Sequence, residues 1–229
     1  MEKLTNVTST FSVFGNVSDL LSKVEAIKEF LQDYKHEESK GTLPNGLPTV
    51  SHVFHKANKA VIIRSYRLDI QFGYNEETND TVEDFLAFVN ESVAKLSSLA
   101  NSKFNRVAYT DATFVRKNDE NMKKFNEAFN VANIFGSNGD ELQLRVNNIT
   151  EVSGETTNAV TVIQNGAVQK KTQGETTPQA REEVIFVNND INSSAFSREP
   201  RFTWDASLKL LSDYIMLAKE RTEKVINKF

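Results

Sequence analysis

VIIRSYRLDIQF, residues 61–72, is the stretch of the chain whose pattern identifies a β-strand most clearly. Its even positions are mainly apolar and alternate with polar residues, which is typical of a strand with one buried face and one wet face. These apolar positions are Ile62, Tyr66, Leu68, Ile70 and Phe72. We therefore predict one strand here. Arg64 interrupts the apolar face, and we interpret it as an end-of-strand residue whose charged tip reaches water; a buried ion-pair partner is the alternative.

Two segments precede this strand. Val50 to His55 is prone to β-structure, and Ala57-Asn58-Lys59 would form the turn of a hairpin between the two strands. The stretch from His36 to Thr49 contains two glycines and two prolines, so it is expected to be a long loop.

The rest of the first half has the same mixture of strands and helices. Thr8 to Phe14 is β-prone, and Ser18 to Tyr34 has apolar residues at helical spacing. Thr81 to Leu99 repeats the helical pattern, and Asn105 to Val115 is again β-like. Residues 1–116 therefore read strand, helix, two strands, helix, strand, which is the βαββαβ order of ferredoxin-like folds.

Residues 117–229 are expected to add a short helix, a run of antiparallel strands forming a β-meander, and one long C-terminal helix. The segments are Asp119 to Phe129 for the short helix, Leu142 to Val146, Ala159 to Ile163 and Glu183 to Val187 for strands, and Trp204 to Asn227 for the final helix. We predict an α+β fold with a largely antiparallel sheet, in which both halves pack as one compact unit.

Asn165-Gly166 is the dipeptide best suited to a two-residue hairpin turn, because both residues readily adopt positive φ. A bulge within a longer strand is the other interpretation.

The final helix has an unusually wide apolar face. Leu210, Tyr214 and Leu217 widen the main stripe, so the helix needs a large partner surface. Packing across a sheet is the favoured interpretation. An interface with a partner chain through these three residues is the second.

Composition excludes several classes of protein. The chain has 229 residues, no cysteine and a formal net charge of −4, with a pI of about 5.5. The absence of cysteine excludes disulfides and thiolate metal sites. The acidic balance argues against a nucleic-acid partner, because phosphate binding needs clustered Lys and Arg. No stretch is apolar enough to cross a membrane, and we expect a cytoplasmic protein with no membrane partner.

The sequence contains no complete catalytic, metal or cofactor motif. His52 and His55 lie three residues apart on an expected strand, so they point to opposite faces and cannot hold one metal together. Phosphate-binding glycine motifs and a nucleophile elbow are also absent. We therefore assign no catalytic residue, no metal site and no cofactor.

Six polar residues form the candidate binding cluster, because they fall on two strands that a sheet brings together. Structural pairing across strands is the favoured interpretation of this cluster, and a small-ligand receptor or an enzyme is the alternative. The residues are Arg64, Arg67, Asp69, Arg106, Tyr109 and Asp111.

RNA binding through the ferredoxin-like half is a second alternative, because RNA-recognition domains share the order of elements. Those domains carry exposed aromatics in a basic, glycine-containing strand, whereas residues 105–114 offer only Tyr109.

Four short motifs are considered together: Val61 to Gly73, the Phe85 to Leu99 helix, Arg106-Val107-Ala108-Tyr109, and Phe186 to Ile191 ahead of the final helix. Together they resemble a sporadically distributed family of uncharacterised prokaryotic and phage-borne proteins. The family's middle strand resembles Arg-Ile-Gly-Leu-Arg-Tyr, and this chain lacks its glycine and second arginine. The resemblance implies no catalytic residues, and the family's patchy distribution is compatible with phage or mobile-element conflict.

These observations favour a non-enzymatic cytoplasmic binding or regulatory protein that acts through protein contacts or self-association. The sheet edge, the stretch from His36 to Thr49 and the final helix are the expected contact surfaces.

Overall fold

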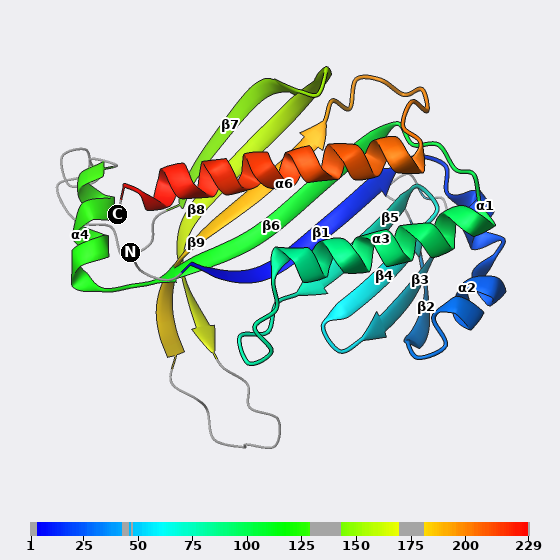
Figure 1. Cartoon of the computed structure of the whole chain (residues 1–229), viewed down its shortest axis with the longest axis horizontal. Coiled ribbons are helices and arrows are strands. Elements are labelled where there is room, and N and C mark those ends of the chain that lie inside the picture. Colours follow the sequence, from blue (N-terminus) through cyan, green and yellow to red (C-terminus); the bar gives the residue numbers. More distant parts are fainter. Residues whose placement is uncertain (1–3, 43–45, 47, 129–142, 170–180, 229) are drawn as a thin grey trace.

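The computed structural model describes residues 4–42, 46, 48–128, 143–169 and 181–228. Its centre is one nine-stranded sheet with the strand order β2-β3-β4-β5-β1-β6-β9-β8-β7, and every neighbouring pair is antiparallel. β1 and β6 lie in the middle, so the sheet runs without interruption from the first half of the chain into the second (Figure 1). The α+β class, the antiparallel sheet and the C-terminal helix are confirmed.

The elements have the following bounds. The strands are β1 (Thr5–Phe14), β2 (Lys35–Thr42), β3 (Pro48–Lys56), β4 (Lys59–Arg64), β5 (Arg67–Gly73), β6 (Arg106–Arg116), β7 (Gln143–Val152), β8 (Glu155–Gln169) and β9 (Arg181–Ser193). The helices are α1 (Ser18–Leu21), α2 (Val24–Phe30), α3 (Val82–Leu99), α4 (Asp119–Ala128) and α6 (Trp204–Ile226).

Residues 61–72 form a hairpin, and the prediction of a single strand is wrong. β4 ends at Arg64, Ser65 and Tyr66 form the turn, and β5 begins at Arg67, which is paired with Arg64. The alternation of apolar and polar residues continues from β4 into β5, because a turn of two residues does not shift it by one position. Tyr66 occupied an apolar position in that pattern, but its side chain is 60% exposed at the turn.

His36 to Thr42 belongs to a strand, so the expectation of a loop from His36 to Thr49 is also wrong. β2 pairs with β3 from Lys35 opposite His55 to Thr42 opposite Pro48. β2 is an edge strand with mostly exposed side chains, which explains why it lacks an alternating hydrophobic pattern. Residues 43–45 and 47 lie outside the described part of the chain.

The βαββαβ order of the first half is not confirmed, because four strands separate α2 from α3 instead of two. The helix expected from Ser18 to Tyr34 is divided into α1 and α2. Neither of the two short helices has a side-chain cap, and Lys23, between them, leaves the helical conformation with φ −113° and ψ 18°.

Asn165 and Gly166 lie inside β8, so they form no hairpin turn. The pairing of β8 with β9 continues in register through both residues, with Gly166 opposite Val184. A Cβ atom at Gly166 would lie 2.6 Å from the Phe186 ring. A larger side chain at position 166 would therefore have to displace the Phe186 ring, which packs directly on the strand.

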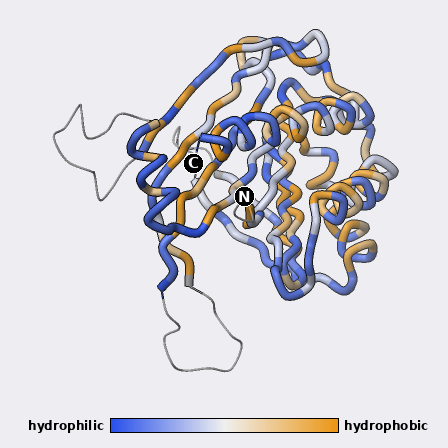
Figure 2. Tube along the Cα trace, turned by 60° about the vertical axis from the view of Figure 1, so that its left-hand side comes forward, coloured by the Kyte–Doolittle hydropathy of each residue, from blue (hydrophilic) through white to orange (hydrophobic). Residues whose placement is uncertain are grey.

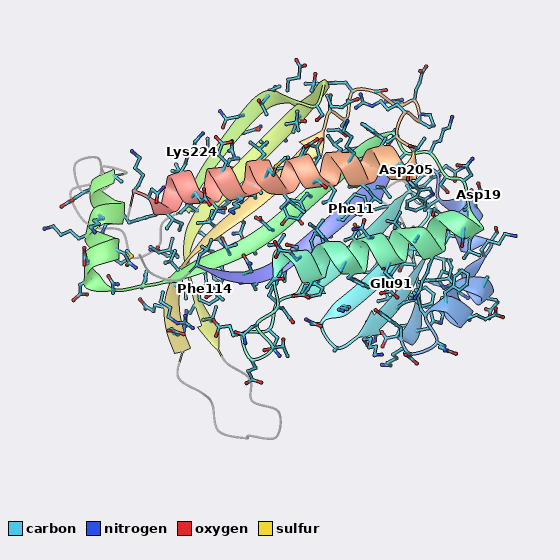
Figure 3. All side chains as sticks on the ribbon, in the orientation of Figure 1. Phe11, Asp19, Glu91, Phe114, Asp205 and Lys224 are labelled. Atoms are coloured by element: carbon cyan, nitrogen blue, oxygen red, sulfur yellow. The ribbon has the colours of Figure 1, made fainter. Side chains whose placement is uncertain are left out.

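α3 and α6 lie on one face of the sheet and run side by side over its central strands (Figure 1). Phe11 points between these two helices and is fully buried (Figure 3). Hydrophobic and hydrophilic residues alternate along the strands (Figure 2), as expected for a sheet covered on one side. We call the covered side the helix face and the other side the open face.

Leu210 and Tyr214 are buried on the helix face, and Leu217 is half-buried. The wide apolar face of the final helix is therefore largely used within the chain. Leu210 and Tyr214 are not exposed to a partner.

Among the described residues, no helix has the length and apolar character required to cross a bilayer.

Candidate functional site

The six residues of the candidate cluster lie on both faces of the sheet. Tyr109 and Asp111 point to the helix face, whereas Arg106, on the same strand, points to the open face because of the strand's two-residue period. Arg64, Arg67 and Asp69 are also on the open face. The structure thus divides the cluster into a pair under the helices and a group of four on the opposite side.

Tyr109 and Asp111 line a cleft of about 750 Å³ on the helix face. β1 and β6 form its floor, and the N-terminal half of α3, the C-terminal half of α6 and residues 74–80 form its walls. Apolar side chains contribute to the walls, namely Leu4, Val82, Leu86, Ile215 and Met216. This volume is in the usual range for small-molecule sites.

A chain of hydrogen bonds crosses the cleft floor. The Ser9 hydroxyl lies 2.9 Å from the Tyr74 hydroxyl and 3.0 Å from the Tyr109 hydroxyl. The Tyr109 hydroxyl donates a long bond of 3.4 Å to Asp111 Oδ2. Both nitrogens of Asn189 donate to the other oxygen, Asp111 Oδ1, with the side-chain Nδ2 at 2.9 Å. Oδ2 is consequently the less satisfied oxygen and the one available to a ligand.

Asn189 is itself fixed by α6 and β8. Its Nδ2 donates to the Thr222 hydroxyl at 2.9 Å, and its Oδ1 accepts from the Thr161 hydroxyl at 2.8 Å. Arg221 donates in turn to Thr161 at 2.7 Å. Asp111 is therefore held in place by residues from three elements.

The titratable side chains on the floor of the cleft have raised pKa values. Burial raises the pKa of Asp111 to about 6, although its hydrogen bonds with Asn189 and Tyr109 act in the opposite direction. Burial also raises the pKa of Tyr74 to about 12 and the pKa of Tyr109 well above its usual value. At pH 7 the phenols are neutral and Asp111 is mostly ionised.

The cleft is acidic overall. Its lining contains five carboxylates and one lysine, namely Glu76, Asp80, Glu83, Asp111, Glu223 and Lys219. Asp80 is occupied by hydrogen bonds from Asn58, from the Asn75 backbone and from Thr78. The excess of negative charge attracts cations.

On the open face, Asp69 is buried between two arginines. Its carboxylate pairs with Arg64 and Arg67 and accepts a hydrogen bond of 2.6 Å from Ser12. Asp69 lies on the face that the alternation predicted to be wet, but it is only 1% exposed there. Arg64 ends β4 with its side chain 42% exposed, as in the favoured interpretation, and it is also the ion-pair partner of a buried carboxylate, which was the alternative.

Arg106 reaches this group across an aromatic ring. Its guanidinium lies 4.7 Å from the centre of the Phe14 ring, and that of Arg67 lies 4.9 Å from the same ring. Phe14 is paired with both arginines in the sheet.

The histidines are separated as expected. His52 contacts His36, with 3.1 Å between ring nitrogens, and His55 lies 3.3 Å from Glu37. Within the described ranges, no three His, Asp or Glu side chains are arranged to hold a metal ion.

Comparison of the chain with protein-family models and with curated proteins found no match. The resemblance to the phage-borne family therefore stays a prediction.

Sequence reasoning missed Ser9, Tyr74 and Asn189, which complete the cleft floor. Asn189 was noted only as part of a motif, and no local signal shows that it contacts Asp111, which lies 78 positions away. The alternation of β6 was a usable signal, because it separates Arg106 from Tyr109 and Asp111.

Proposed function

We propose that the chain is a small-molecule binding protein whose ligand occupies the cleft between α3 and α6. The observation that carries the proposal is the Asp111 carboxylate on the floor of a cleft of about 750 Å³, with Oδ1 held by Asn189 and Oδ2 left to a distant phenol. This corresponds to the receptor alternative of the sequence analysis.

The ligand class follows from the lining. A protonated amine would pair with Asp111 Oδ2 and be attracted by the acidic excess, while Leu86, Ile215 and Met216 would contact an apolar part. Neutral Tyr109 and Tyr74 hydroxyls supply further hydrogen bonds. An amphipathic amine combines these features.

Binding is tested by calorimetry with 2-phenylethylamine at pH 7.5, with 2-phenylethanol as the uncharged control. We expect saturable binding of the amine only, and at least ten-fold weaker binding by Asp111→Asn. Equal binding of amine and alcohol, or an unaffected Asp111→Asn variant, would contradict the assignment.

A second pair of variants tests the location. Ser212 lines the cleft, and its hydroxyl donates to the Leu208 carbonyl. Ser98 on α3 is also exposed and bonded to its own helix, but lies outside the cleft lining. Ser212→Trp should abolish amine binding and Ser98→Trp should leave it unchanged.

Self-association through β7 is the second candidate, in line with the expectation of protein contacts. β7 is an edge strand, and Ile149 and Val146 on it are 76% and 40% exposed. An exposed apolar edge strand favours pairing with another strand. Sedimentation velocity should detect a dimer that Ile149→Lys abolishes; a monomer at all concentrations would exclude it.

Three finer expectations are retained as proposals. We propose that β4-β5-β1-β6 with α2 and α3 is a ferredoxin-like unit extended by β2 and β3. Supporting this, α3 connects β5 to β6 on the two sides of β1. Superposition of an experimental structure on ferredoxin-like domains tests it. Cytoplasmic location and a phage-conflict role are likewise proposed, and are tested by cell fractionation and phage plating on a host lacking the protein.

A further inference from the structure

The open face carries a groove on the side of the sheet opposite the cleft. A groove of about 370 Å³ lies beside the β4–β5 turn, between that turn and β2 and β3. Its lining consists of Ser39, Gly41, Thr42, Thr49, Ser51, Arg64, Ser65, Tyr66 and Arg67. These residues include five hydroxyl side chains besides Tyr66, two arginines and no carboxylate.

Positive charge exceeds negative charge along this part of the sheet. Sheet pairing places Ser51, Arg64, Arg67, Phe14 and Arg106 in one row across five strands. Asp69, the only carboxylate that pairs with this row in the described residues, is shared between Arg64 and Arg67. Three guanidinium groups are thus balanced by one carboxylate.

Of the three arginines in this row, Arg106 has no ion-pair partner among the described residues. Within the described residues its guanidinium makes no hydrogen bond or ion pair, and its Nε atom is buried without an acceptor. Stacking on Phe14 fixes the group in place. A positioned guanidinium with unused donors is suited to an anion.

We propose that this groove binds a phosphate-bearing small molecule. One phosphate contacts Arg64, Arg67 and the groove hydroxyls, and Arg106 is available to a second phosphate further along the row. Arginine forks match the geometry of phosphate oxygens, and serine and threonine hydroxyls donate to them. Tyr66, 60% exposed at the rim, offers a ring face to an organic substituent.

Selectivity for pyrophosphate over other anions should come from the positions of the three arginines, because the chain as a whole carries a net charge of −4 and repels anions. Binding of pyrophosphate is therefore expected to exceed binding of orthophosphate or sulfate at equal ionic strength.

The test is titration calorimetry of the full chain with pyrophosphate in a low-salt buffer at pH 7.5. Arg106→Gln removes a cation that has no ion pair to lose, so the variant should fold. Arg145→Gln is the matched control. Arg145 is an exposed residue of β7 that also lies on the open face, but it is outside the row.

We expect saturable pyrophosphate binding, at least ten-fold weaker in Arg106→Gln and in Arg64→Gln, and within two-fold of wild type in Arg145→Gln. Absence of binding, or an equal loss in all three variants, would overturn the proposal. If Arg64→Gln does not fold, the pyrophosphate affinities of Arg106→Gln and Arg145→Gln still test the proposal.

Further titrations distinguish the source of the phosphate. If ADP binds more tightly than pyrophosphate and adenosine shows no detectable binding, the ligand is nucleotide-like and stacks on Tyr66. Equal affinities identify the inorganic group alone. Binding of a short single-stranded RNA without binding of pyrophosphate would overturn the small-molecule proposal.

Discussion

The two faces of the sheet at β1 differ in both packing and charge. On the helix face, Phe11 and Val13 are fully buried, and the nearby cleft contains more acids than bases. On the open face, Ser12 and Phe14 lie among arginines, with one buried carboxylate. Alternate residues of one strand therefore serve two environments of opposite charge. Substitutions at alternate positions of β1 therefore probe two different environments.

The largest expected effect is a difference in stability between alanine variants of two phenylalanines on β1. Phe11→Ala removes a fully buried ring and should lower the free energy of unfolding by about 3–5 kcal/mol. Phe14→Ala on the open face loses mainly its two arginine contacts, about 1 kcal/mol. Urea unfolding measures both. Similar losses would mean that the open face is covered by something in solution.

Much of the fold could be predicted, because its strongest elements have local signals. The apolar residues at helical spacing in residues 81–99 and 204–227 located α3 and α6 to within one residue. The hairpin at Ser65 and Tyr66 was missed because a two-residue turn preserves alternation. β2 was missed because an edge strand needs no buried face.

The candidate site was predictable only in part, since it depends on contacts between distant segments. Asp111, Asn189 and Tyr74 meet through sheet pairing and the packing of α6, and no local pattern encodes that meeting. Arg64, Arg67 and Asp69 are close in sequence, but their association depends on the hairpin that the sequence analysis missed, because on a single strand Arg64 would point away from Arg67 and Asp69.

The second effect concerns the cleft and depends on pH. Burial raises the pKa of Asp111 from 3.8 to about 6, so between about pH 4 and 6 the folded chain binds a proton that the unfolded chain has released. This contribution to stability is present below pH 4 and is lost as the pH rises through 6.

Asp111→Asn should remove that dependence and raise the free energy of unfolding at pH 8 by roughly 1–3 kcal/mol. Urea unfolding from pH 4.5 to 8 measures the change. Asp190→Asn, at an exposed position on the open face, is the control. A pH profile of Asp111→Asn that matches wild type would show that Asp111 does not titrate in this window.

A smaller effect is expected at the distal end of the open face. Gly166→Ala brings a methyl group to 2.6 Å from the Phe186 ring, which also contacts Phe114 at 6.0 Å between ring centres. Displacement of the ring should cost about 1–2 kcal/mol, and thermal unfolding measures it. Gly41→Ala in β2 is the control, because its nearest contact is 3.7 Å away. Equal melting temperatures would show that Phe186 moves freely.

The smallest effect tests whether the start of α3 belongs to the cleft. Thr81 and Asp84 form a capping box, and Thr81 lines the cleft; Thr203 caps α6 away from it. Thr81→Ala and Thr203→Ala should each lower stability by about 1 kcal/mol. Only Thr81→Ala should also weaken binding of 2-phenylethylamine, because fraying of the first turn moves one wall of the cleft. Calorimetry measures the affinity of both variants for the amine, and their similar loss of stability makes the two affinities comparable. If both weaken binding equally, the loss reflects global destabilisation, and the helix-face site would have to lie deeper, around Asp111 and the tyrosines alone.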